Sequence, residues 1–339
     1  MLTTLRNGGP KGGRWFSLID KVYFPANLCA AWSKVLRNKG AAGIDGQSIA
    51  SFEHNAEVYL KEISDALREE RYEPSPVRRQ GIPKPGTNKK RPLGIPVVKD
   101  RIVQGALRHV LEPLWEARFA EHSYGFRPGR SCHDALRRVA HLLEDGYEVV
   151  VDADIQSYFD EIDKDLLMKA VSEVVSDGRV LRLVRLFLEQ SVVEEMKEWV
   201  PTKGTPQGAV ISPLLANIYL HSVDLAIRDS GFELVRYADD LVILCKSRED
   251  AERALALLHT LMTGLKLKLH PEKTKIVDTR EVGAGFDFLG YRFERSHSRL
   301  NRKLRKKSRD ALKAKIRELT PRKAGRSIKM IVADLNPVL

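Results

Sequence analysis

The stretch E-L-V-R-Y-A-D-D-L-V-I-L-C (residues 233–245) places two adjacent carboxylates, Asp239 and Asp240, between two apolar runs. The apolar runs predict two short strands, with the polar step between them at the bend of a hairpin. Aspartate is a common turn former because its side chain can accept hydrogen bonds from the nearby backbone. On this stretch alone, the turn explains both aspartates.

A second acidic stretch, V-V-V-D-A-D-I-Q-S-Y-F-D (residues 149–160), changes this interpretation. Its valine run predicts a buried strand, and Asp152 and Asp154 lie two residues apart, so they share one strand face. If this strand lies beside the hairpin, Asp154 meets Asp239 and Asp240. Three carboxylates so close together repel one another and take up protons unless divalent cations lie between them. Hard oxygen ligands suit Mg²⁺, and a pair of such ions supports in-line phosphoryl transfer.

The basic residues are concentrated near the C-terminus. The chain has a net charge of +12, and residues 292–329 hold sixteen Lys or Arg but three Asp or Glu, so the remainder is close to neutral. Such a block indicates a polyanion-binding surface, most often for nucleic acid. The alternative is a solvated helix face or a disordered tail. Helical spacing of the apolar residues in the block favours basic amphipathic helices; these residues are Leu300, Leu304, Ala311, Leu312, Ile316 and Leu319.

Strands and helices alternate irregularly along the chain, with hairpins, which is typical of the α+β class. No run of eighteen apolar residues occurs, so no membrane span is expected. Ser212 followed by Pro213 predicts a helix start, with a capping hydroxyl and then proline at the first helical position. Ser131 and Ser247 are expected to cap two further helices. Other helices are expected over residues 20–38, 51–71 and 100–115, and strands over residues 77–82, 147–153, 275–279 and 286–293.

Together the two acidic stretches resemble motifs A and C of reverse transcriptases, D-I-x-x-[FY]-F-D followed downstream by Y-A-D-D. Further segments resemble, in the family's order, the remaining motifs of the group II intron and related non-LTR enzymes. The resemblance extends over about residues 43–295, and the chain is similar to the bacterial group II intron-like reverse transcriptases, the intron-encoded protein or maturase family. The further segments are G-I-D-G (43–46), I-P-K-P-G-T-N-K-K-R-P-L-G-I-P-V-V-K-D-R-I-V-Q (82–104), Y-G-F-R-P-G-R-S-C-H-D-A-L (124–136), G-T-P-Q-G-A-V-I-S-P-L-L-A-N-I-Y-L (204–220), H-P-E-K-T (270–274) and F-L-G-Y (288–291).

The resemblance implies a right-hand polymerase of the α+β class. Residues 1–75 would form an N-terminal helical extension that carries the G-I-D-G motif. Residues 76–295 would form the fingers and a palm built on a ferredoxin-like antiparallel sheet. Residues 296–339 would form a basic α-helical thumb, or the start of the maturase domain, that is incomplete compared with full-length relatives.

The implied reaction is RNA-directed DNA synthesis, in which a primer 3′-hydroxyl attacks the α-phosphate of a dNTP with two Mg²⁺ ions bound, or Mn²⁺ in their place. The implied partners are dNTPs, an RNA template with a DNA or RNA primer, and a group II intron RNA whose mobility or splicing the protein would serve. Two alternatives stay open: a domesticated reverse transcriptase of phage defence, CRISPR spacer acquisition or DNA repair, and a non-enzymatic RNA-binding splicing cofactor. A bacterial cytoplasmic location is expected, since no apolar signal region begins the chain. The sequence does not indicate an oligomeric state.

For the metal site, the resemblance implies Asp154, Asp239 and Asp240 as ligands. The backbone carbonyl of Ile155 would complete one metal site next to the dNTP. Asp152 is a weaker candidate, because a solvated strand acid explains it equally well.

For the dNTP, the resemblance implies that Lys84 and Arg91 clamp the triphosphate, since Arg contacts phosphate bidentately and Lys supplies a point charge. Phe159 would be the steric gate that excludes a 2′-hydroxyl, and Gln207 would pack against the nucleotide. Lys273 would act as an acid when pyrophosphate departs. The competing explanations are solvated charges for the three cations, a core position for Phe159 and a plain loop for Gln207.

Six residues are expected to contact nucleic acid. Arg127 and Arg130 lie in the loop F-R-P-G-R, where they would touch template phosphate or else fix the fingers by pairing with acids. Tyr237 would lie near the primer end. The C-terminal basic helices would grip the template–primer through its backbone, using Arg302, Lys303 and Lys306.

Overall fold

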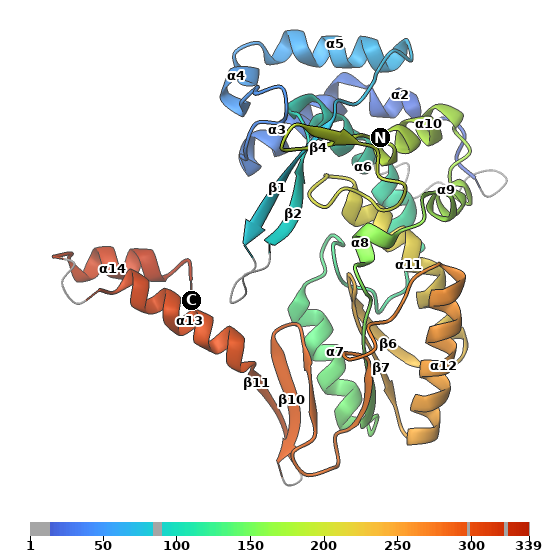
Figure 1. Ribbon diagram of the computed structural model, residues 1–339, viewed down its shortest axis with the longest axis vertical. Coiled ribbons are helices and arrows are strands. Elements are labelled where there is room, and N and C mark those ends of the chain that lie inside the picture. Colours follow the sequence, from blue (N-terminus) through green and yellow to red (C-terminus); the bar gives the residue numbers. More distant parts are fainter. Residues whose placement is uncertain (1–13, 84–89, 297–298, 322–324, 339) are drawn as a thin grey trace.

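The computed structural model describes residues 14–83, 90–296, 299–321 and 325–338 of the chain. Helices and a small sheet form an upper region, a second sheet with long helices forms a lower region, and two C-terminal helices project to one side (Figure 1). This arrangement of fingers, palm and thumb confirms the α+β right-hand polymerase expected from the sequence. No helix in the described ranges has both the length and the apolar character needed to cross a membrane.

The lower sheet is the palm, with strand order β6-β7-β3-β8 and antiparallel pairing throughout. β3 (Val149–Asp154) is central, and β6 (Glu233–Tyr237) is joined to β7 (Asp240–Cys245) by the predicted hairpin. β8 (Lys275–Asp278) forms the other edge. This order is that of a ferredoxin-like sheet and confirms the expected palm. Three long helices flank it: α7 (Cys132–Glu144), α11 (Ser212–Asp229) and α12 (Arg248–Gly264).

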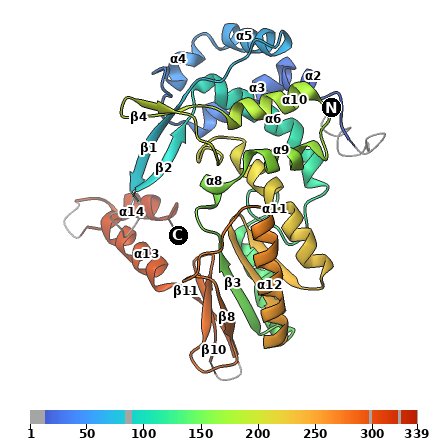
Figure 2. The same ribbon diagram turned by 45° about the vertical axis from the view of Figure 1, so that its right-hand side comes forward.

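The palm sheet is covered on both faces, which explains the run of valines in β3. Val149 and Val151 belong to the core that includes α11 and α12, and Figure 2 shows α12 packed along the sheet. Val150 belongs to a second core with α7 and three phenylalanines of the C-terminal sheet. Because successive strand side chains alternate, Asp152 and Asp154 lie on the same side as Val150. The predicted sharing of one face by these two carboxylates is therefore confirmed.

The fingers contain a sheet of order β2-β1-β4-β5. β1 (Val77–Pro83) and β2 (Lys90–Ile95) form an antiparallel hairpin, and β1 pairs in parallel with β4 (Val192–Glu194). β5 (Lys197–Trp199) is the exposed edge strand. The helices of this region and of its junction with the palm are α2 (Ile19–Val22), α3 (Pro25–Asn38), α4 (Ile49–Glu53), α5 (Ala56–Arg68), α6 (Val98–Glu116), α8 (Tyr158–Glu161), α9 (Lys164–Ser172) and α10 (Gly178–Leu188).

Two helices predicted as continuous near the N-terminus are each broken in two. The first is interrupted at Phe24, whose ψ of 126° is extended, and Pro25 begins α3. A residue before proline avoids the helical region because the proline ring clashes with it, so the break follows from the sequence. The second helix is interrupted at His54 and Asn55, between α4 and α5.

The start of α11 also differs from the prediction. Ser212 is the first helical residue rather than the cap, and its hydroxyl lies 2.9 Å from the carbonyl oxygen of Pro206 and 2.6 Å from Thr205 Oγ1. The side-chain oxygen of Gln104, on α6, accepts a hydrogen bond from the Val210 N–H at 2.8 Å. The buried Gln104 side chain therefore holds the segment just before α11, and no side chain of the described residues caps the first turn of the helix itself.

The C-terminal part begins with a three-stranded antiparallel sheet of order β11-β10-β9. The single strand expected over residues 286–293 is divided at Leu289 and Gly290, which both have positive φ, into β9 (Gly285–Phe288) and β10 (Tyr291–Ser296). The helix expected from Leu300 onward is wrong at its start. Leu300 belongs to strand β11, where it pairs with Arg295 and packs against the second core. The bounds of β11 are Arg299–Leu304.

Two helices follow: the basic α13 (Lys306–Leu319), and α14 (Ile328–Leu335), which is mostly apolar and carries one Lys and one Asp. They project from the body beside the fingers and the palm (Figure 1). Neither helix contains a buried residue, so the apolar residues of α13, such as Leu312 and Ile316, are at most half-buried. A sequence period cannot distinguish a helix face that packs from one that stays exposed.

Candidate active site

Asp154, Asp239 and Asp240 lie together at one end of the palm sheet. Asp154 is the last residue of β3, and the antiparallel register places it directly opposite Asp240, the first residue of β7. Asp239 precedes Asp240 in the turn after Tyr237, and Ala238 in the same turn has a left-handed φ of 59°. The register thus brings together the two acidic stretches that are about eighty residues apart in sequence.

Burial and like charge both act on these acids. Burial by the surrounding protein, followed by the carboxylates of Asp239 and Asp154, raises the pKa of Asp240 from 3.8 to about 6. Burial also raises the pKa of Asp152 to about 6, although Lys275 opposes this shift. An excess of negative charge therefore stands at this end of the sheet, as expected where a cation binds.

Lys273 supplies one positive charge to this group. Its Nζ lies 3.0 Å from Asp154 Oδ2, and its side chain is otherwise largely exposed. The preceding loop is fixed to β3, because the His270 N–H donates to the Asp154 carbonyl oxygen at 2.8 Å and Leu269 bridges Ile155. The structure thus brings the predicted Lys273 into contact with the predicted metal ligand Asp154.

The donor set fits Mg²⁺ as an open site. No three His, Cys, Asp or Glu side chains of the described residues are grouped tightly enough to hold a metal ion by themselves. Mg²⁺ is commonly held by one or two carboxylates, with water and substrate phosphates as the remaining ligands. The facing carboxylates of Asp154 and Asp240 match that pattern. The backbone of Ile155 follows directly, and its role as a carbonyl ligand stays a prediction.

A cavity of about 320 Å³ opens beside these carboxylates. Acids line it from β3 and β7, and cations line it from the loop before β8 and from the segment before α13. The turn between β9 and β10 closes one side. Its charged lining residues are Asp152, Asp154, Asp240, Glu272, Lys273, Lys275, Asp287 and Arg305.

Phe159 and Gln207 lie next to each other on the fingers side. Phe159 is half-buried, with its ring edge-on to that of Phe126 at 6.5 Å, and its carbonyl oxygen accepts the Thr205 N–H at 2.9 Å. Gln207 Nε2 lies 3.4 Å from Asp160 Oδ2. The loop of residues 203–208 therefore rests on the turn that carries Phe159.

The same loop is attached to the fingers hairpin. The Gly94 N–H of β2 donates to the Gln207 carbonyl oxygen at 2.6 Å. A side chain on Gly208, whose φ is 105°, would come within 2.4 Å of the Gly94 carbonyl oxygen. Glycine is required here because the two backbones approach so closely. Arg91 lies on β2 opposite Ile82, and Lys84 lies outside the described residues.

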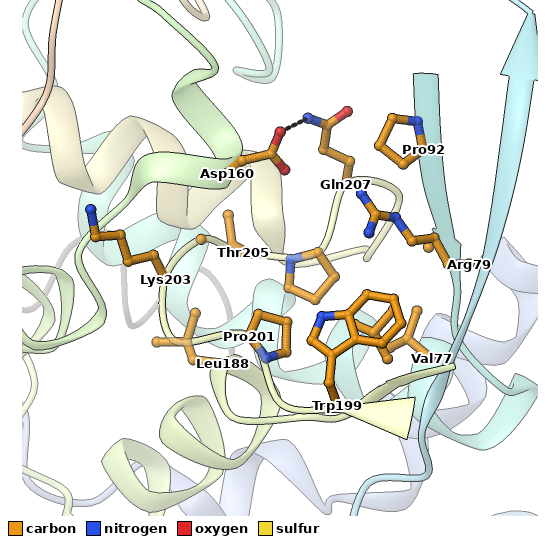
Figure 3. A pocket seen from close by; sticks show the side chains of 14 residues that line it. Val77, Arg79, Pro92, Asp160, Leu188, Trp199, Pro201, Lys203, Thr205 and Gln207 are labelled. Atoms are coloured by element: carbon orange, nitrogen blue, oxygen red, sulfur yellow. Dashed lines mark hydrogen bonds between the residues drawn. The ribbon is translucent and has the colours of Figure 1, made fainter. Parts of the chain in front are cut away.

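A second cavity, of about 350 Å³, lies between β1 and this loop (Figure 3). Asp160 and Gln207 line one end of it and Trp199 the other, and the Arg79 guanidinium lies 5.6 Å from the centre of the Trp199 ring. The sequence analysis missed Arg79 and Trp199. The strand pattern could have indicated Arg79. It follows the buried Val77 by two residues, so both side chains lie on one face of β1.

The predicted contact of Arg127 with template phosphate is wrong. Its side chain is 3% exposed, and it pairs with Glu116 at 2.7 Å and donates to the carbonyl oxygens of Ala120 and Ser123. The other prediction for this residue, that it fixes the fingers by pairing with an acid, describes the structure. Arg130 lies partly exposed over the ring of Tyr124.

The remaining predicted nucleic-acid contacts line the palm and the C-terminal elements. Tyr237 is half-buried beside the turn that contains Ala238 and Asp239. Arg302 lies 5.5 Å from the centre of the Tyr291 ring, and Lys303 Nζ lies 2.8 Å from Glu294 Oε1, so both are on a strand rather than a helix. Lys306 is exposed at the start of α13.

Comparison with known protein families decides the assignment. Residues 82–293 match the family model described as reverse transcriptase (RNA-dependent DNA polymerase). The chain belongs to the reverse transcriptase family. The match begins in the fingers hairpin and ends in β10. It contains the three aspartates, Phe159 and Gln207, whereas Arg79 and the basic residues from Arg302 onward lie outside it.

Two relatives and one solved structure are similar to this chain over much of its length. The chain is 36% identical to the protein YkfC of Escherichia coli (strain K12), over 83% of this chain and 84% of that protein. It is 39% identical to the group II intron-encoded protein LtrA of Lactococcus lactis subsp. cremoris over 57% of this chain, but it spans about a third (32%) of that protein. Telomerase from Candida albicans shares the fold, with a TM-score of 0.53, 13% identity, and coverage of 90% of this chain and 60% of that chain.

Proposed function

We propose that this chain is an RNA-directed DNA polymerase that adds deoxynucleotides to a primer 3′-hydroxyl. The observation that carries the proposal is the register of β3 and β7, which sets Asp154 opposite Asp240, next to Asp239, on the wall of an open cavity. Membership of the reverse transcriptase family supports the choice of RNA as template and of dNTPs as substrate.

In this proposal Asp154, Asp239, Asp240 and the carbonyl of Ile155 hold two Mg²⁺ ions, with Mn²⁺ as a substitute. Such ions, when bound, lower the pKa of the attacking hydroxyl and offset charge on the leaving group. The chain's own contribution is to hold the carboxylates in fixed positions. Lys273, already in contact with Asp154, supplies the proton to the departing pyrophosphate.

The nucleotide would lie between the palm and the fingers hairpin. The Phe159 ring excludes a ribose 2′-hydroxyl, and Gln207 packs against the incoming sugar and base. Arg91 and Lys84 bind the triphosphate from the fingers. The Gly94 N–H donates a hydrogen bond of 2.6 Å to the Gln207 carbonyl oxygen. This bond supports the proposal, because it attaches the loop of residues 203–208 to the strand that carries Arg91.

The template–primer would run from the palm along the C-terminal elements. Arg130, Tyr237, Arg302, Lys303 and Lys306 contact its backbone in this proposal, and the exposed basic face of α13 adds charge. Such contacts are salt-dependent because binding releases counterions. Identity of 39% to LtrA over 196 residues supports service to a group II intron RNA as the biological setting.

The test is extension of a DNA primer on an RNA template with dNTPs and Mg²⁺. Wild type is compared with Asp239→Ala and with Asp229→Ala, a control that removes an exposed carboxylate at the far end of α11. The proposal expects extension by wild type and by the control, and none by Asp239→Ala. Failure of wild type to extend any primer, while it binds RNA, would instead support the splicing-cofactor alternative.

A further inference from the structure

Arg236 is a buried arginine directly behind the turn that contains Ala238 and Asp239. It lies on β6, one residue before Tyr237, and its side chain is 2% exposed. A guanidinium has five N–H donors, and an unpaired buried charge is costly. The partners of this side chain therefore account for its presence in the palm.

All the donors of Arg236 are used. Nε and Nη2 donate to the two carboxylate oxygens of Asp224 at 2.7 and 2.6 Å, and Nη2 also donates to Ser123 Oγ at 2.8 Å. Nη1 donates to Asn217 Oδ1 and to the carbonyl oxygen of Ala238, each at 2.9 Å. Asp224 and Asn217 both belong to α11, so this long helix fixes the guanidinium and the guanidinium holds the turn.

Ala238 needs such a restraint. Its φ of 59° is left-handed, a conformation that a residue with a Cβ adopts only when its surroundings impose it. A second group confines it, because Gly125 is so close that a Cβ there would lie 2.3 Å from the Ala238 nitrogen. Asn217 joins both restraints: it accepts from Arg236 and donates to the Gly125 carbonyl oxygen at 2.8 Å.

We propose that Arg236 is a positioning residue of the polymerase site: it holds Ala238 in its left-handed conformation so that Asp239 and Asp240 face Asp154 before any metal binds. The inference rests on the proposed function, because that function is what makes these aspartates metal ligands. What it adds is how the positions of those ligands are fixed. Preorganised ligands bind a metal more tightly than ligands that must first be ordered. Arg236 therefore acts on metal affinity and on kcat, and leaves the nucleotide contacts of the fingers unchanged.

The experiment measures Mn²⁺ binding to the full chain by electron paramagnetic resonance, together with thermal unfolding and the kcat and KM for dNTP. Arg236→Lys keeps a charge opposite Asp224 but cannot donate to five acceptors at once. Arg127→Lys is the matched control, since it weakens a buried arginine pair that does not contact the turn. Ala238→Gly is added to Arg236→Lys, because glycine adopts positive φ without steric strain.

The expected result is a loss of Mn²⁺ affinity of about tenfold or more in Arg236→Lys, with a lower kcat and a KM for dNTP within about twofold of wild type. Arg127→Lys lowers the unfolding temperature but keeps the wild-type Mn²⁺ affinity. Ala238→Gly restores affinity to Arg236→Lys in part. Rescue by a residue that removes strain distinguishes positioning from a general loss of stability.

Wild-type Mn²⁺ affinity in folded Arg236→Lys overturns the inference, as does the absence of any rescue by Ala238→Gly. If Arg236→Lys does not fold, Asn217→Ala decides. It keeps the Arg236–Asp224 pair but removes both the acceptor that directs Nη1 toward the turn and the donor that fixes Gly125 against Ala238. Wild-type Mn²⁺ affinity in this variant overturns the inference too. Wild type is also compared with Asp239→Ala: Mn²⁺ binding that this variant does not reduce overturns the inference. Primer extension by wild type is read separately, so failure of the proposed function is distinguishable from failure of the positioning role.

Discussion

Asp154 lies directly opposite Asp240 across an antiparallel strand pair, at the end of the palm sheet where Asp239 turns into β7. Side chains opposite each other on adjacent strands are near neighbours, and like charges in such a pair destabilise the sheet. This pair therefore lowers the stability of the metal-free fold, and in the proposed function a bound cation offsets the repulsion. Substitutions in the Asp154–Asp240 pair should therefore change the stability of the protein as well as its activity.

Asp240→Asn is expected to stabilise the metal-free protein. The substitution removes the repulsion that contributes to the raised pKa of Asp240, and solvent at its exposed edge limits the gain to about 1 kcal/mol. Urea unfolding at pH 8 in EDTA measures it. Asp229→Ala, at an exposed site, serves as the control and should not change the midpoint. A less stable Asp240→Asn would contradict the electrostatic description.

Removal of Lys273 is expected to move metal affinity and turnover in opposite directions. Lys273→Ala deletes the cation that pairs with Asp154 at 3.0 Å, so Mn²⁺ should bind about threefold more tightly. The kcat should fall, because the acid proposed for pyrophosphate departure is lost. Lys273→Arg keeps the charge and should leave the affinity near that of wild type. A drop in both quantities for Lys273→Ala would rule out competition between Lys273 and the metal.

Replacement of Phe159 is expected to relax sugar selection. Phe159→Ala removes the ring that we assign to exclusion of the 2′-hydroxyl, so the preference for dATP over ATP in kcat/KM should fall about tenfold or more. Single-nucleotide incorporation on one template measures the preference. Phe126→Ala, which removes the ring edge-on to Phe159, tests whether orientation of the gate matters as well. An unchanged preference for dATP over ATP in Phe159→Ala would show that Phe159 only packs against the core and does not select the sugar.

Gln104→Ala is expected to destabilise the protein by about 1–3 kcal/mol, because it leaves the Val210 N–H at the start of α11 without its acceptor. Denaturant unfolding measures the change. Ser131→Ala is the matched comparison, since Ser131 caps α7 at an exposed site, and it should cost about 1 kcal/mol or less. An effect of Gln104→Ala smaller than that of Ser131→Ala would show that the segment before α11 does not depend on this hydrogen bond.

Asp100 predicts a pH dependence of stability. Burial raises the pKa of Asp100 from 3.8 to about 7, although Tyr72, Ser75 and Gln190 donate hydrogen bonds to it. Because the folded state holds this proton more tightly than the unfolded state, the contribution is fully present below pH 4. It is then lost as pH rises to 7, by up to about 4 kcal/mol.

The measurement is urea unfolding of wild type and Asp100→Asn from pH 4 to pH 8. The amide does not titrate, so the difference between the two proteins should grow with pH up to about 7 and then stay constant. A difference that is independent of pH would show that Asp100 is ionised in the folded protein throughout the range.

The sequence was sufficient to predict that Asp154 lies beside the turn that carries Asp239 and Asp240. Alternation in V-V-V-D-A-D placed Asp152 and Asp154 on one face, and the apolar runs around Asp239 and Asp240 gave the hairpin, because both inferences use local spacing. Ser131 likewise caps its helix as predicted, through a box closed within four residues.

The errors arise where a partner at no fixed spacing in the sequence decides the outcome. The Ser212 hydroxyl does not cap α11 because it lies against Thr205 Oγ1 and the Pro206 carbonyl oxygen instead. Leu300 forms a strand because Arg295 pairs with it and the phenylalanine core accepts it. Arg127 is buried because Glu116 and two carbonyl oxygens surround it. None of these partners has a fixed spacing from the residue concerned.

The most direct measurement is single-turnover addition of one dNTP to a DNA primer on an RNA template, with Mg²⁺ titrated, for wild type and Asp240→Asn. The account predicts saturable, Mg²⁺-dependent addition by wild type. It predicts a loss on the order of 10³-fold in Asp240→Asn, with template–primer binding unchanged. Equal rates for the two proteins would contradict the assignment of the Asp154–Asp240 pair as the metal site of a polymerase.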